Sequence, residues 1–426
     1  MPNPMQSAGT TASASGDTGA LRLFVFALFF IFGGITSLND VLIPKLRELF
    51  TLGYGEAMLV QSAFFAAYFI VSLPAAALVR RIGYMRTASV GLLCMTAGCL
   101  LFVPASAFGL FGAFLAAIFV LAAGITTVQV VANPLISMLG SAASAHSRLT
   151  FAQAFNSLGT TIFPYFGAIL ILGNLAGEDR SQLQGEALRA YTSQATHAVM
   201  QAYVGLALAL IVIAFAVWQA RNRLQEARAA AATGESAFGL LRQPRFAFGA
   251  LCIFLYVGAK VAIGSLIVNY LMQADVLGLA QGDAGKHVPY YWGGALVGRF
   301  VGAWLLRVIS PGKVLATAAA VAILLLAVSA QSSGALSGYS LLAIGLFNSI
   351  MFPTIFSLAS EGLGERAAQG SGIICMAIVG GAVVPYLTGR VADVTGLKLA
   401  LWVPAVCYAI IVAFGIYARR PRTASA

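Results

Sequence analysis

Charged side chains are scarce in this sequence. Asp, Glu, Lys and Arg together make up 9% of its 426 residues, whereas they make up about 25% of a typical soluble domain. Hydrophobic residues account for 60% of the chain, and the mean hydropathy is +0.88. A soluble protein of this length has no need for so much apolar surface. The composition therefore predicts an all-α protein that crosses a membrane several times.

Reactive and metal-binding residues are also few. The five cysteines all lie in apolar runs without CxxC or metal-ligand spacing, which is typical of small packing residues. The three histidines are far apart in the sequence. No glycine-rich phosphate loop is followed by a lysine, which argues against an ATP-driven pump. We therefore expect no enzymatic activity, no metal site and no organic cofactor.

The apolar residues fall into segments long enough to cross a bilayer, which takes about 20 residues in a helix. Twelve such segments can be counted, at residues 22–44, 57–79, 87–104, 108–139, 149–173, 196–218, 246–273, 288–308, 313–330, 336–359, 367–389 and 397–418.

The distribution of basic residues sets the expected orientation. The net charge of +11 might indicate a nucleic-acid partner, but most of the 25 Lys and Arg residues lie in loops on one side of the spans. Positive loops face the cytoplasm. The pattern predicts a multi-pass protein of a bacterial inner membrane, with the lipid bilayer as partner, no nucleic acid, and both termini in the cytoplasm.

Two halves are expected from weak internal repetition. The stretch around Pro134 resembles that around Pro353, and the stretch from Gly159 to Pro164 resembles that from Gly380 to Pro385, each about 220 residues further on. Two parallel repeats of six helices are the plan of many transporters, whose site lies between the halves. The expected divisions are a disordered cytoplasmic tail at 1–20, one bundle at 21–218, a linker at 219–245, a second bundle at 246–418 and a tail at 419–426.

Two ionisable residues stand at membrane depth. Asp40 lies in the first apolar segment, and the repeat offset leads from Asp40 to Lys260 in the seventh. Intramembrane charges are costly and are functional candidates by default. We predict that the two side chains face a shared cavity and pair there. The alternatives are that Asp40 sits at the water interface and that Lys260 extends its side chain to an interface.

Amides form the second set of candidates. Gln129 and Asn133 share one helix face, and so do Gln153 and Asn156. Amides both donate and accept hydrogen bonds, as sugar hydroxyls do, and aromatic faces can cover the apolar side of a pyranose ring. The alternative is that the amides join helices within the membrane. The other candidates for sugar binding are Asn39, Gln61, Tyr256, Asn348 and Phe352.

Several stretches together resemble the fucose–proton symporter family of the major facilitator superfamily. They are SLNDVLIPKLRELFTL, QSAFFAAYFIVSLPAAALVRRIGY, ANPLISMLG, RLTFAQAFNSLGT, IFLYVGAK, VGRFVGAWLLR, FPTIFSLASEGLG and GSGIICMAIVGGAVVP, which lie in both halves, and the resemblance covers about residues 22–418. It implies a major facilitator fold of twelve helices in two pseudo-symmetric bundles, and cotransport of a sugar with a cation by alternating access.

The resemblance also implies roles for single residues. Asp40 matches the proton-linked acid of the first helix, and Gln153 and Asn156 match sugar-binding amides of the fifth. Phe352 stands where the fucose carriers have Tyr, and Gln129 stands where they have a second membrane acid. Lys260 replaces a Gln or Glu, and its charge would make it harder for Asp40 to take up a proton.

These features predict a monomeric importer of a hexose such as glucose, galactose or mannose, coupled to protons. Sodium coupling, uncoupled sugar transport, and fucose or N-acetylglucosamine as substrate remain alternatives. An exporter of amphipathic compounds should have more aromatic residues and fewer amides in its cavity. A sugar sensor without transport usually carries a large soluble domain, whereas the linker here has only 27 residues.

Overall fold

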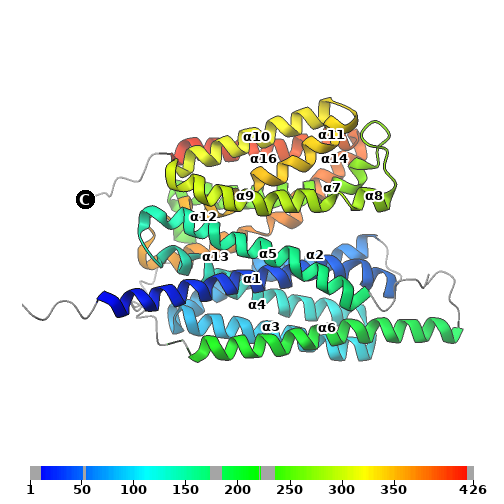
Figure 1. The fold of residues 1–426 in the computed structure, drawn as a ribbon, viewed down its shortest axis with the longest axis horizontal. Coiled ribbons are helices and arrows are strands. Elements are labelled where there is room, and N and C mark those ends of the chain that lie inside the picture. Colours follow the sequence, from blue (N-terminus) through cyan, green and yellow to red (C-terminus); the bar gives the residue numbers. More distant parts are fainter. Residues whose placement is uncertain (1–10, 51–53, 173–184, 220, 222–235, 420–426) are drawn as a thin grey trace, which may run out of the picture.

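The chain folds almost entirely into long helices (Figure 1). The computed structural model describes residues 11–50, 54–172, 185–219, 221 and 236–419. Some side chains within these ranges, those of Asn39 and Asp40 among them, lie outside the described part. The prediction of an all-α membrane protein is confirmed over the described residues.

The N-terminal half contains six long helices. They are α1 (Thr11–Phe50), α2 (Tyr54–Ile82), α3 (Tyr84–Phe108), α4 (Phe111–Met138), α5 (Ala145–Leu172) and α6 (Gly185–Gln219), with the short 3-10 turn η1 (Ala142–Ser144) between α4 and α5.

The C-terminal half is divided more finely. Its elements are η4 (Ala237–Arg242), α7 (Pro244–Leu271), α8 (Gln281–Gly285), α9 (Val288–Val308), α10 (Pro311–Gln331), α11 (Gly334–Asn348), α12 (Met351–Ser360), η5 (Gly364–Arg366), α13 (Ala367–Ala377), α14 (Gly380–Thr395), α15 (Leu397–Ala400) and α16 (Trp402–Ala418).

Ten stretches of the described chain are long and apolar enough to cross a membrane. Helices α5 and α9 are not among the ten, yet each is as long as a span and lies at a predicted position. Both carry strongly polar side chains in mid-helix, namely Gln153 and Asn156 on α5 and Arg299 on α9. With these two helices the molecule has the twelve spans that were predicted, and α5 and α9 face each other between the halves (Figure 1).

The first helix extends further than the sequence indicated. Helix α1 begins at Thr11, within the segment predicted to be a disordered tail at 1–20, whereas residues 1–10 lie outside the described part of the chain. The residues from Thr11 to Gly19 are rich in Ala and Ser. Alanine has the highest helix propensity, and adding turns to an existing helix costs little, so the span propagates toward the N-terminus.

Two spans of the C-terminal half are interrupted near their middle. The tenth span consists of α11 and α12, separated after Asn348, and the eleventh consists of α13 and α14, separated after Ala377. An interrupted helix leaves backbone carbonyls without helical partners, and these must find other donors inside a membrane.

Close helix contacts within the N-terminal half depend on glycine. A Cβ atom built on Gly159 of α5 would lie 2.1 Å from the carbonyl oxygen of Phe30 on α1. One on Gly98 of α3 would lie 2.4 Å from the backbone nitrogen of Leu121 on α4. Small residues at such positions let helices approach closely, which is how helices gain packing energy in a membrane.

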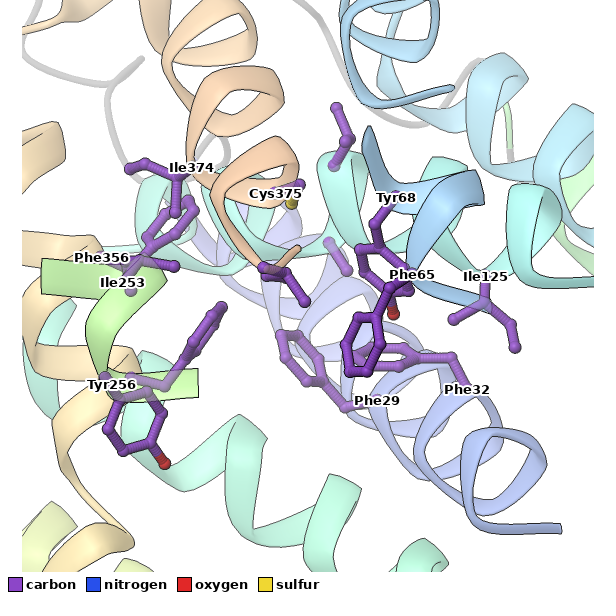
Figure 2. Packing of buried hydrophobic residues seen from close by; sticks show 14 of the residues in the cluster. Phe29, Phe32, Phe65, Tyr68, Ile125, Ile253, Tyr256, Phe356, Ile374 and Cys375 are labelled. Carbon is purple, nitrogen blue, oxygen red and sulfur yellow. The ribbon is translucent and has the colours of Figure 1, made fainter. Parts of the chain in front are cut away.

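Apolar side chains of both halves meet in the centre of the molecule. Figure 2 shows Phe29, Phe65 and Tyr68 of the N-terminal half near Tyr256 and Cys375 of the C-terminal half. All five are at most 5% exposed.

Polar contacts join the two halves near one end of the helix bundle. This is the end at which α2, α4 and α12 end and α5 begins, and we call it the basic end. Ser147 Oγ donates to the carbonyl oxygen of Ala303 at 2.7 Å, and Ser371 Oγ donates to that of Val130 at 2.8 Å. His146 Nε2 lies 3.1 Å from a carboxylate oxygen of Glu361. We call this set of contacts the inter-half seam.

We expect Gly159→Ala to destabilise the protein, because its new Cβ would clash with the backbone of α1. Overpacking of this kind costs about 1–3 kcal/mol. The measurement is the melting temperature of the purified protein in detergent. Gly112→Ala in α4 is the matched control, since nothing lies within 4 Å of its Cβ position. An equal effect of both substitutions would contradict the close α1–α5 contact.

Candidate functional site

The predicted sugar amides of α5 lie where α1, α5 and α9 meet. The amide nitrogen of Asn156 donates to the carbonyl oxygen of Phe29 on α1 at 3.3 Å. A Cβ atom on Gly33 would lie 2.4 Å from the same nitrogen, so α1 can approach this amide only because it has glycine there. The half-buried side chain of Asn156 is therefore held between helices of the N-terminal half.

The amides of α4 turn toward two different helices. Gln153 Nε2 lies 3.5 Å from Asn133 Oδ1, which links α5 to α4. The Asn133 Nδ2 atom is buried and has no hydrogen-bond acceptor among the described residues. The Gln129 Oε1 atom accepts a hydrogen bond of 2.9 Å from the hydroxyl of Tyr68 on α2. Gln129, Asn133 and Gln153 are each at most 7% exposed.

Two of the predicted aromatic residues lie together in the C-terminal half. The rings of Tyr256 on α7 and Phe352 on α12 are tilted, with their centroids 6.4 Å apart. The hydroxyl of Tyr256 donates to the carbonyl oxygen of Asn348 at 2.8 Å, one of the carbonyls at the interruption of the tenth span. Phe352 also stacks on Phe356 one turn later.

The side chain of Asn348 forms hydrogen bonds with two tyrosines. Its Nδ2 donates to the hydroxyl of Tyr291 on α9 at 2.8 Å, and its Oδ1 accepts from the hydroxyl of Tyr408 on α16 at 2.7 Å. Asn348 is 1% exposed. In this conformation its amide connects three helices of the C-terminal half.

Of the two charged candidates, Asp40 and Lys260, the structure describes the side chain of Lys260 alone. The backbone of Asn39 and Asp40 belongs to α1, but both side chains lie outside the described residues. Lys260 is half-buried near the middle of α7, as its sequence position predicted, and its ammonium nitrogen lies 4.9 Å from the ring centre of Trp292 on α9. An aromatic face stabilises such a cation. Gln61 is half-buried on α2.

Arg299 was not among the predicted site residues. Its guanidinium is 5% exposed and donates to the carbonyl oxygen of Gln153 at 2.7 Å and to that of Ser349 at 3.3 Å. It also donates to the hydroxyl of Ser157, and lies 3.5 Å from Asn156 Oδ1. A cation inside a predicted span was the available signal, but the sequence does not say which helix it contacts.

The described residues contain no group of three or more His, Cys, Asp or Glu side chains able to hold a metal ion. Amides of α5 and the guanidinium of Arg299 meet at the junction of the two halves, while Lys260 and the tyrosines around Asn348 contact one another's helices within the C-terminal half. Such a set can bind a neutral polar molecule through hydrogen bonds.

Residues 24–378 match the family described as the Major Facilitator Superfamily. The match covers most of the chain. This chain belongs to the major facilitator superfamily. It is therefore a transporter and not an enzyme, and the resemblance noted in the sequence is confirmed.

The curated relatives agree with the match. The chain is 47% identical over 416 residues to a Brucella abortus protein named glucose/galactose transporter, with 97% of each chain covered. It is 33% identical over 426 residues to the Escherichia coli L-fucose-proton symporter, with 96% of each covered.

The fold is close to that of solved transporters. The crystal structure of the fucose transporter FucP in the outward conformation matches with a TM-score of 0.84 at 31% identity, over 94% of this chain and 99% of that one. The proton:xylose symporter XylE matches with a TM-score of 0.68 at 13% identity, over 94% of this chain and 95% of that one, which indicates the fold alone.

The tyrosine network around Asn348 leads to a stability prediction. Tyr408→Phe should lower the free energy of unfolding by about 1–3 kcal/mol, because it leaves the buried Asn348 Oδ1 without its donor. The measurement is the melting temperature in detergent. Tyr417→Phe on the same helix is the control, since Tyr417 is 53% exposed. If the two variants melt alike, the hydrogen bond contributes nothing to stability.

Proposed function

We propose that this chain imports a monosaccharide together with protons across a bacterial inner membrane, as a monomer. The preferred substrate is a hexose of the glucose and galactose class. The observation that supports this most strongly is the 47% identity to a glucose/galactose transporter over 97% of both chains. The polar cluster at the junction of the halves agrees with it, since it consists mainly of neutral groups.

Sugar hydroxyls both donate and accept hydrogen bonds, and amides do the same. In the proposal, Gln129, Asn133, Gln153 and Asn156 bind hydroxyl groups from the N-terminal half. The Asn133 Nδ2 atom has no acceptor among the described residues, so a hydroxyl oxygen can supply one. The ring of Phe352, with Tyr256 behind it, covers the apolar side of the sugar.

The remaining candidates take more distant roles in the proposal. Gln61, near the start of α2, and Asn39, in the last third of α1, contribute from the part of each helix that is distant from the basic end. Asn348 holds Tyr291 and Tyr408 in place behind the site, and becomes available to the sugar only if this network rearranges.

Coupling is assigned to Asp40. In the proposal it is protonated from outside and releases its proton inside, when Lys260 approaches it. A nearby cation stabilises the ionised carboxylate. Because Gln129 cannot take up a proton, Asp40 is the single acid assigned to the task. Sodium coupling and uncoupled transport are the alternative outcomes.

The proposal also includes the orientation of the molecule across the membrane. The basic end, with both termini, faces the cytoplasm, as expected from the positive loops. The inter-half seam is then the barrier that separates the site from the cytoplasm. The match to a fucose transporter in its outward conformation supports this assignment.

The substrate class can be tested by thermal stabilisation of the purified protein. A ligand at 100 times its dissociation constant stabilises by about 2.7 kcal/mol. We expect glucose and galactose to raise the melting temperature more than fucose, N-acetylglucosamine or sucrose. Repeating the series at two pH values and with sodium separates the coupling ions. A panel in which no sugar raises the melting temperature would refute the proposed substrate class.

The coupling role can be tested with Asp40→Asn in proteoliposomes. We expect the variant to exchange sugar across the membrane but not to accumulate it against its gradient, because the amide cannot carry a proton. Asp393→Asn is the control, since this carboxylate is exposed at the surface. Normal accumulation by Asp40→Asn would exclude the assignment.

A further inference from the structure

We propose that Arg299 is a positioning residue that latches the two halves together at the level of the sugar amides. The idea rests on the proposed function for its orientation, but its contacts are those of the structure. The guanidinium joins the backbone of α5, in the N-terminal half, to the interrupted tenth span of the C-terminal half.

The acceptors of Arg299 lie on both sides of the boundary between the halves. Gln153 and Ser157 on α5 accept from its Nη1, and the carbonyl oxygen of Ser349 accepts from its Nε. The guanidinium spreads five N–H donors over three nitrogens, so it reaches acceptors that lie further apart than those around the single nitrogen of a lysine ammonium. A buried charge is costly unless it is hydrogen-bonded in this way.

The acceptor in the C-terminal half lies at the interruption of the tenth span, between Asn348 and Met351. In an α-helix the Ser349 carbonyl would accept from the backbone nitrogen of residue 353, but this residue is Pro353, which has no N–H, so the carbonyl is available to Arg299. Helix α9 can lie against this interruption because it has glycine there. A Cβ on Gly298 would lie 2.2 Å from the carbonyl oxygen of Leu346.

Opening toward the cytoplasm requires α5 and α9 to separate. Arg299 then loses its acceptors on α5, while the acceptor within its own half can stay. The bonds to Gln153 and Ser157 therefore favour the closed seam. Hydrogen bonds to a charged group of this kind shift an equilibrium on the order of 10- to 100-fold. Because these bonds end on the segment that carries the sugar amides, the latch also fixes α5 in the closed state.

A native cysteine can report the opening. Cys375 on α13 is fully buried, one turn after Ser371, whose hydroxyl crosses to α4. It lies on the side of α13 that faces Tyr68 of α2 (Figure 2). When the seam opens, this thiol gains access to water and to reagents.

The experiment compares the full-length protein with Arg299→Gln and Arg299→Lys, without sugar. N-ethylmaleimide modification is quantified for the peptide that contains Cys375, with Cys375→Ser to verify the assignment. We expect modification about tenfold faster or more in Arg299→Gln. Arg299→Lys should be intermediate, because acceptors this far apart are harder to reach from the single nitrogen of an ammonium.

Two further variants keep the test decisive. Ser157→Ala removes an acceptor on α5 without touching the charge, and should increase modification in the same direction but less. Arg22→Gln is the matched control, since Arg22 donates to the Leu139 carbonyl within one half at 2.8 Å. It should leave the modification rate of Cys375 unchanged.

Two results would overturn the latch. One is an unchanged modification rate in Arg299→Gln; if glucose binding is weaker in the same variant, Arg299 is a sugar ligand instead. The other is faster modification of all five cysteines together with a lower melting temperature, which would indicate general loosening. Because no sugar is added in the modification assay, failure of the proposed substrate class would leave this test intact.

Discussion

Every polar group that enters a bilayer needs a partner inside the protein, because lipid offers none. This constraint explains why the polar side chains of the chain gather between the halves. Helices α5 and α9, which carry Gln153, Asn156 and Arg299, face each other there. Gln153, Asn156 and Arg299 satisfy one another's hydrogen-bonding needs across this boundary. The partners that maintain the fold therefore include the amides proposed to bind the sugar.

The same constraint explains the tyrosines of the C-terminal half. Tyr256 and Arg299 supply donors to the carbonyls that the interrupted tenth span leaves exposed. Tyr291 and Tyr408 hold the Asn348 side chain from both sides. Removing a donor from such a buried network costs more than the hydrogen bond itself contributes, because a polar atom is left without a partner.

Much of the fold could be predicted from the sequence. The lengths of the apolar runs predict the spans, because bilayer thickness determines how many residues a helix needs. The spacing of Gln153 and Asn156 predicts one shared helix face, since that depends only on helical periodicity, and α5 is helical through both residues. The start of α1 at Thr11 was missed, because the polar N-terminal segment was interpreted from its composition alone.

The partners of the site residues could not be predicted, because they depend on tertiary contacts. Asn348 was proposed for the sugar, yet its amide meets two tyrosines that are about 60 residues away in sequence. Arg299 lies within the segment predicted as the eighth span, at 288–308, but nothing in its neighbourhood in the sequence indicates α5. The interruptions of the tenth and eleventh spans lie next to Pro353 and to Gly380 and Gly381, which disfavour helix, but such residues are also tolerated inside continuous spans, as Pro134 is in α4.

The interruptions make the two halves mechanically unequal, although their sequences repeat each other. In the N-terminal half α4 and α5 are continuous, and Pro134 is contained within α4. Their counterparts in the C-terminal half are divided after Asn348 and Ala377. A helix bends most easily where its ladder of hydrogen bonds is broken. The tenth and eleventh spans can therefore bend at these points more easily than their counterparts α4 and α5 can, although both pairs occupy equivalent places in the two halves.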